Sequence, residues 1–219
     1  MAKEKKKKRS KLNLQTPISK VRPMKIKSAR YYIEHAREYP IIGCWVYADW
    51  EKSGITPVVV ARQQPNDQIV FCVCLIDYWC LGIKDAHANA NVSPSKSKTN
   101  LPKMCSGEEE KVSVEFAHEL IYGAMEYAER YGFHPHRDFT IQKADKVLDP
   151  PDMHPRKGEI EFGKDGQPFY ASGPYDDEAK INRILSTLER TAGKGNYKFL
   201  IGMGPGDFFD DFDDFEELE

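Results

Sequence analysis

The segment QIVFCVCLIDYW, Gln68 to Trp79, is rich in β-branched and aromatic residues. Because it is apolar at successive positions, both of its faces should be buried, and we expect it in the middle of a sheet. Two similar runs precede it, IIGCWVYA (Ile41 to Ala48) and ITPVVVAR (Ile55 to Arg62), and the turn-forming sequences EKSG and QQPND separate the three. Together they predict an antiparallel three-stranded meander.

Helical patterns lie on either side of the meander. The strongest is VEFAHELIYGAMEYAERY, Val114 to Tyr131, whose apolar residues recur at helical spacing on one face. Ser113 is placed to cap its start and Gly132 to cap its end. Shorter helices are predicted over Lys27–Glu38, Phe139–Leu148 and Asp176–Ala192.

Two further elements complete the prediction. EIEFGKDGQPFYAS, Glu159 to Ser172, has the pattern of a hairpin with Asp165 and Gly166 at its turn. NYKFLIGM, Asn196 to Met203, follows as a last strand, and the polar segment from Asn91 to Glu110 is expected to be a long surface loop. The predicted fold class is α+β: a single domain with a three-stranded meander, a hairpin and a C-terminal strand, packed by three to four helices.

The charge is concentrated at the two ends. Residues 1–25 contain ten Lys or Arg and one Glu, whereas residues 207–219 contain eight acids and no base. Such segments bury too little apolar surface to offset the entropy of ordering. We therefore predict a disordered basic tail over 1–23, a folded domain over 24–204 and a disordered acidic, aromatic tail over 205–219.

Composition also indicates a location. The chain has no apolar run of about 18 residues, and its basic start is not followed by an apolar segment, so neither a membrane span nor a secretory signal is predicted. Five cysteines cannot all pair, which favours reduced thiols in a cytoplasmic protein. In a eukaryotic host the basic tail would resemble a nuclear import signal.

Each tail suits a partner. Cations that neutralise phosphates bind nucleic acid without reading its sequence, and the candidates are Lys5, Lys6, Lys7, Lys8, Arg9 and Lys11. If the acidic tail folded as a helix, its phenylalanines would form an apolar stripe that docks on a protein partner or on the basic tail. The candidate residues are Phe208, Phe209, Phe212 and Phe215. The alternative for the basic tail is a solubility role without a partner.

The connector GFHPHRDF, Gly132 to Phe139, places His134, His136 and Asp138 at alternate positions. That spacing is similar to the His-x-His-x-Asp-His signature of metallo-β-lactamase-type hydrolases, although Phe139 replaces the final histidine. The alternative is an extended connector between two helices, in which Asp138 caps the second.

A second candidate metal site is formed by Asp77, Lys84 and Asp85. Nucleases of the restriction type hold Mg²⁺ with acids near strand ends and keep a lysine beside them. Acids at strand ends are otherwise turn or cap residues, and the sequence from Lys84 to Asn91 is expected to be a polar loop.

Two other motifs are interpreted as structural. Cys72, Cys74 and Cys80 include only one close pair, so core packing is favoured over structural zinc. Glu115 and His118 match half of a di-iron carboxylate site, but no second copy exists, and a solvated helix face is expected.

Four blocks together resemble a family of uncharacterised bacterial proteins: CLGIKDAHANAN, ELIYGAMEYAERYGFHPHRDF, FGKDGQPFYASGPYDD and GKGNYKFLIG. The resemblance covers roughly residues 26–203 and implies one folded domain with variable tails, but no activity. The sequence favours a nonenzymatic binding or adaptor protein that uses its two tails. The alternative is a metal-dependent hydrolase or nuclease, and a divalent metal ion is the one cofactor considered.

Overall fold

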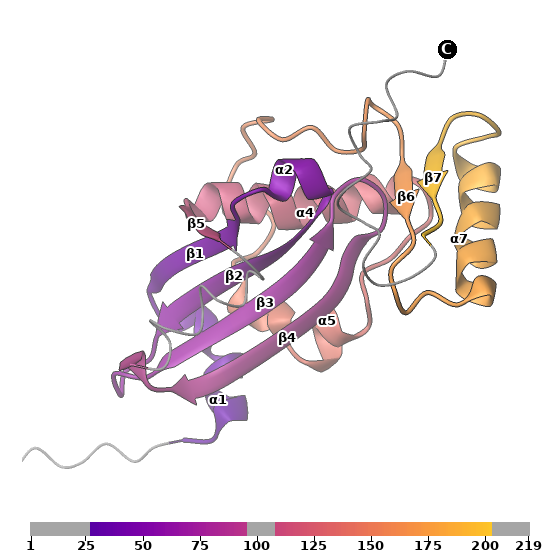
Figure 1. Cartoon of the computed structure of the whole chain (residues 1–219). Helices are drawn as coiled ribbons and strands as arrows, with labels where there is room; N and C mark the ends of the chain where they lie inside the picture. The colour runs from indigo at the N-terminus through magenta and orange to yellow at the C-terminus, as the bar shows by residue number, and fades with distance from the viewer. Residues whose placement is uncertain (1–26, 96–107, 203–219) are drawn as a thin grey trace, which may run out of the picture.

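The computed structural model describes residues 27–95 and 108–202 (Figure 1). Within these ranges it contains a five-stranded antiparallel sheet, a two-stranded parallel sheet and six α-helices. The predicted α+β class is confirmed. The predicted tails, 1–23 and 205–219, lie outside the described residues.

The large sheet contains the three predicted strands and two more. Its strand order is β4-β3-β2-β1-β5, and every neighbouring pair is antiparallel. The central segment QIVFCVCLIDYW forms β3, which has a strand on each side, as its two apolar faces predict. The strands span Ile41–Tyr47 (β1), Ile55–Gln63 (β2), Ile69–Asp77 (β3), Gly82–Val92 (β4) and Glu109–Val112 (β5).

The prediction of a polar loop from Lys84 to Asn91 was wrong, because these residues form most of β4. Alanines and polar residues alternate along this strand, so that Ala86, Ala88 and Ala90 are buried while Asp85 and His87 are exposed. This is the period of two expected for a strand with one covered face. Ala, Asn and Asp have low strand propensity, but pairing with β3 along nearly the whole strand outweighs that preference.

A β-bulge interrupts this pairing beside the β3–β4 turn. Ile76 pairs with Ile83, but the preceding residue of β3, Leu75, pairs with Asp85. Lys84 is therefore the additional residue on β4. The bulge lets Ile83 and Ala86 both face the core, and it changes the direction of the side chain at the inserted position.

Helices cover one face of the large sheet. The longest, α4, crosses it and buries Leu120, Ile121 and Ala124 in the main core. Ser113 caps its start as predicted, because its Oγ accepts a hydrogen bond of 3.1 Å from the N–H of Phe116. Helices of this layer span Ala29–Glu34 (α1), Val114–Arg130 (α4), Asp138–Ile141 (α5) and Ala144–Val147 (α6).

Three local predictions are corrected. The helix predicted over Phe139–Leu148 is two short helices, because Lys143 between them has a left-handed backbone with φ of 58°. The first predicted helix ends at Glu34 and continues as a 3₁₀ turn over Ala36–Glu38. A one-turn helix, Trp50–Ser53 (α2), also occupies the β1–β2 connection, where a turn was expected.

The C-terminal part forms a separate strand–helix–strand unit. Phe169–Ala171 (β6) pairs in parallel with Lys198–Leu200 (β7), and Glu178–Thr191 (α7) connects them (Figure 1). The predicted hairpin was therefore wrong: its tight turn forms, with one bridge between Lys164 and Gln167, but β6 pairs with β7.

Cys80 links the two parts of the fold. It lies in the β3–β4 connection and is buried with Tyr170, Ile184 and Leu188 beneath α7. The four described cysteines are buried free thiols, which confirms their packing role. No helix in the described part of the chain is long and apolar enough to cross a membrane.

Candidate metal centre

The candidate site lies where the connector between α4 and α5 passes the outer edge of β4. Gly132 ends α4 with a left-handed backbone, φ of 80°. The N–H of His136 then donates a hydrogen bond of 2.9 Å to the carbonyl of Ile83. Because β4 is an edge strand, this carbonyl is free to pair, and it holds the connector against the sheet.

Three side chains from these two segments converge. His136 Nδ1 lies 3.8 Å from Asp85 Oδ1 and 3.7 Å from Asp138 Oδ2. One ligand atom from each residue lies within 4.8 Å of the other two. Ligands with metal bonds of about 2 Å are separated by about 3 to 4 Å, so a small adjustment would allow all three to bind one ion.

The backbone of the connector contacts the ring of His136. The N–H of Asp138 donates a long hydrogen bond of 3.4 Å to the lone pair of His136 Nδ1, and an ion bound at this nitrogen would replace that weak bond. Asp85 Oδ1 also accepts a hydrogen bond of 2.8 Å from the N–H of Ala86, which fixes its carboxylate on the strand. Such contacts to ligand side chains orient them before a metal binds.

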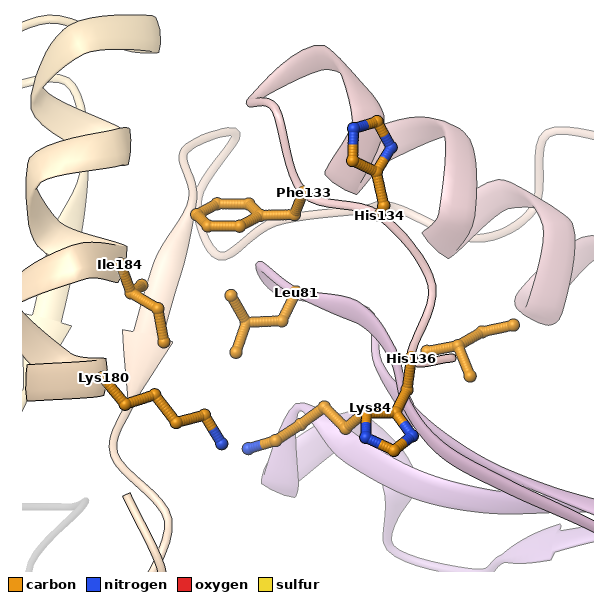
Figure 2. A pocket seen from close by; sticks show the side chains of 8 residues that line it. Leu81, Lys84, Phe133, His134, His136, Lys180 and Ile184 are labelled. Carbon is orange, nitrogen blue, oxygen red and sulfur yellow. The ribbon is translucent and has the colours of Figure 1, made fainter. Parts of the chain in front are cut away.

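The structure brings only two of the three expected residues, His134, His136 and Asp138, together. His136 and Asp138 meet, but His134 points away from His136 (Figure 2). An extended strand would place all three on one face, whereas here the chain enters α5 at Asp138 and the alternation ends. Asp85 of β4 is the third member of the cluster.

Asp77 lies apart from the cluster. It is buried at the end of β3, and its Oδ1 accepts a hydrogen bond of 2.9 Å from the N–H of Cys80. Burial raises the pKa of Asp77 to about 6, while the charge of Lys84 and the turn N–H groups act in the opposite direction. The residue thus caps the β3–β4 turn, as the structural alternative expected.

Lys84 faces a pocket beside the cluster. The pocket has a volume of about 190 Å³ and contains Lys84 and Lys180, whose ammonium ends point toward one another (Figure 2). Lys180 pairs with Asp176 at 2.5 Å. His136 lines the pocket as well as belonging to the cluster, so the two sites adjoin. The complete lining is Leu81, Ile83, Lys84, Phe133, His134, His136, Lys180 and Ile184.

A second polar cluster is buried beneath the sheet. The guanidinium of Arg62 donates to Asp149 Oδ1 at 2.6 Å and to the carbonyls of Val147 and Tyr39 at 2.7 and 2.8 Å. Asp149 Oδ2 also lies 2.9 Å from His154 Nε2. These bonds fix the segment after α6 to strand β2, and neither Arg62 nor Asp149 was singled out from the sequence.

The helix face of Glu115 and His118 is less solvated than predicted. His118 is buried, its Nε2 lies 2.9 Å from the carbonyl of Pro150, and its ring contacts those of Tyr122 and His154. Burial lowers the pKa of His118, so the neutral ring is favoured. The prediction was wrong because the segment after α6 covers this face.

All three members of the converged cluster were candidates from the sequence, Asp85 in one hypothesis and His136 and Asp138 in the other. The two sets of residues meet because β4 is an edge strand that pairs with the connector. A local sequence pattern does not reveal this pairing. The candidate nucleic-acid residues from Lys5 to Lys11 and the phenylalanines from Phe208 to Phe215 lie outside the described residues.

Comparison with known proteins finds no family model that matches the chain, and no curated protein or solved structure is significantly similar to it. The expected resemblance to an uncharacterised bacterial family stays a prediction. Functional inference therefore depends on the geometry and charge of this chain.

Proposed function

We propose that the folded core is a metal-dependent hydrolase in which Asp85, His136 and Asp138 hold one divalent cation. The observation that carries this proposal is the convergence of three ligand atoms within 4.8 Å from two segments far apart in sequence. Three protein ligands are the usual number in catalytic metal sites, because a remaining position must take water or substrate.

The ligand chemistry favours a cation of intermediate hardness. Two carboxylates suit Mg²⁺ and Mn²⁺, whereas an imidazole suits Zn²⁺ and the transition metals. Mn²⁺ and Zn²⁺ accept both ligand types. Either ion would lower the pKa of a bound water and polarise a bound ester, so that water adds across the ester bond.

Metal binding is best tested at the side chain of His136. The acidic residues in 207–219 also attract cations, so total binding by the full chain is not specific to the cluster. Mn²⁺ should selectively broaden the NMR signals of the His136 ring in the full-length protein. Asp85→Asn and Asp138→Asn should each weaken this effect at least roughly tenfold, because each removes a charged ligand.

His87→Gln is the matched control. His87 is exposed on β4, two residues from Asp85 and on the same face, but it does not belong to the cluster. It should leave the broadening of His136 unchanged. Equal broadening of His136 in the wild-type protein and in Asp85→Asn would contradict the proposed metal centre.

Hydrolysis needs a separate measurement. With Mn²⁺ or Zn²⁺ present, the protein should cleave p-nitrophenyl phosphate or bis(p-nitrophenyl) phosphate, and Asp85→Asn and His136→Gln should abolish the activity. Normal metal binding without cleavage of either ester would remove the hydrolase half of the proposal and leave the metal centre standing.

A second proposed function rests on the charge at the two ends. We infer that a cytoplasmic single-domain core over 24–204 carries a nucleic-acid-binding arm and an acidic tail for a protein partner. The support is the ten Lys or Arg in residues 1–25 and the eight acids in residues 207–219. Deletion of residues 1–23 should abolish retention on DNA or RNA at low salt, and unchanged retention would contradict the nucleic-acid role.

A further inference from the structure

The pocket next to the metal cluster brings two ammonium groups to one small space. Lys84 comes from the bulge in β4, and Lys180 comes from the first turn of α7 (Figure 2). Lys84 forms no ion pair within 4 Å among residues 27–95 and 108–202. Two converging lysines repel one another; the ion pair of Lys180 with Asp176 offsets part of this repulsion, and an anion in the pocket would relieve the rest.

The nearest carboxylates are already bound to donors. Asp176 accepts hydrogen bonds from the Tyr170 hydroxyl at 2.9 Å and the Gly173 N–H at 2.8 Å, in addition to its ion pair with Lys180. Burial alone would raise the pKa of Asp176, but these partners and the nearby charge of Lys84 outweigh it and hold the pKa below its ordinary value. Asp77 is buried under the β3–β4 turn. The groups that line the pocket are therefore the cations, not these acids.

The rest of the lining is mostly apolar. Leu81, Ile83, Phe133 and Ile184 line the pocket together with the lysines, and the pocket volume is about 190 Å³. A lining of apolar side chains with a few converging polar groups is typical of small-molecule sites. An inorganic anion would use the lysines but leave this apolar surface in water, whereas an organic anion would use both.

We propose that this pocket binds a phosphate monoester, with Lys84 and Lys180 holding the phosphate and the apolar side chains holding its organic group. A phosphate monoester carries nearly two negative charges at neutral pH, since its second pKa is about 6. It therefore matches two ammonium groups better than a carboxylate does. Binding of a phosphate monoester in this pocket does not depend on the metal centre. A role of the pocket as the substrate site of the hydrolase rests on the proposed function, since His136 borders both sites.

The test is an NMR titration of the metal-free, full-length protein with phenyl phosphate. Methyl signals of Ile83 and Ile184 report on the pocket, which distinguishes it from phosphate bound by the basic residues of 1–25. These signals should shift saturably. Inorganic phosphate and benzoate should each bind more weakly, because the first lacks the organic group and the second lacks one charge.

Lys84→Met is the decisive variant, since it removes one ammonium without breaking a described ion pair. It should weaken binding of phenyl phosphate roughly tenfold or more, as expected for the loss of a charged hydrogen-bond partner. Lys180→Met should have a similar effect. Lys194→Met, an exposed lysine beyond the end of α7, is the control and should bind as the wild-type protein does.

No saturable shift at Ile83 and Ile184 up to roughly 10 mM phenyl phosphate would overturn the proposal. Equal affinity in Lys84→Met and the wild-type protein would also overturn it. Because metal is absent, either result leaves the metal centre standing, and loss of metal binding in Asp85→Asn leaves the phosphate pocket standing.

Discussion

Removing one partner of the buried ion pair between Arg62 and Asp149 should strongly destabilise the fold. The side chain of Arg62 is almost fully buried, and its guanidinium donates to one carboxylate and two backbone carbonyls. Asp149→Asn preserves the size of the side chain but removes its charge, which leaves the guanidinium uncompensated inside the protein. Breaking a buried pair in this way costs about 3 to 5 kcal/mol.

That loss is large against a total stability of about 5 to 15 kcal/mol for a typical domain. For a protein of this length it corresponds to a decrease in Tm on the order of 10 °C. Equilibrium unfolding in urea, followed by the fluorescence of the buried Trp50 and Trp79, measures it directly. Arg62→Met should be comparably destabilising, because it leaves the carboxylate and two carbonyls without this partner.

A double variant measures the interaction energy between Arg62 and Asp149 apart from their contacts with other residues. Arg62→Met combined with Asp149→Asn should lose less than the sum of the single losses, by about 1 to 3 kcal/mol. Arg30→Ala, which removes an exposed ion pair with Glu34, should leave the urea midpoint nearly unchanged. A loss of less than about 1 kcal/mol in Asp149→Asn, or single losses that are additive, would refute the predicted cost of breaking this pair.

Three other variants test local features. Asp77 has a pKa raised from 3.8 to about 6, so the folded state retains its proton to higher pH and stability falls by about 2 kcal/mol as pH rises from 4 to 6; urea unfolding across this range should show that decrease in the wild-type protein relative to Asp77→Asn, and parallel profiles would contradict it. Gly123→Ala places a Cβ 2.2 Å from the ring of Phe162 and should cost about 1 to 3 kcal/mol, whereas an unchanged Tm would show that the ring moves freely. Ser113→Ala removes the cap of α4 and should cost about 1 kcal/mol in the same assay, and no loss would mean that water replaces the hydroxyl.

The parts of the fold that local patterns encode were predictable. The strands β1, β2 and β3 are continuous apolar runs between turn residues, and α4 has a helical stripe with a serine cap. β4 was missed because its residues have low strand propensity. Its alternation of Ala86, Ala88 and Ala90 with polar residues was the available signal, and the bulge at Lys84 interrupts that alternation at its start.

Long-range pairing accounts for the remaining errors. The turn at Asp165 and Gly166 was predicted correctly, since both residues have positive φ. Nothing local indicates that β6 would pair in parallel with β7 rather than across that turn. The site has the same origin: Asp85 and His136 are brought together by one backbone hydrogen bond between the connector and an edge strand.

Anomalous X-ray diffraction from crystals grown with Mn²⁺ is the most direct test of the metal centre. We expect a peak about 2.0 to 2.2 Å from the ligand atoms of Asp85, His136 and Asp138, with at least one further position open to water. A peak bound only elsewhere, or no peak between these three side chains at saturating Mn²⁺, would contradict the proposed metal centre.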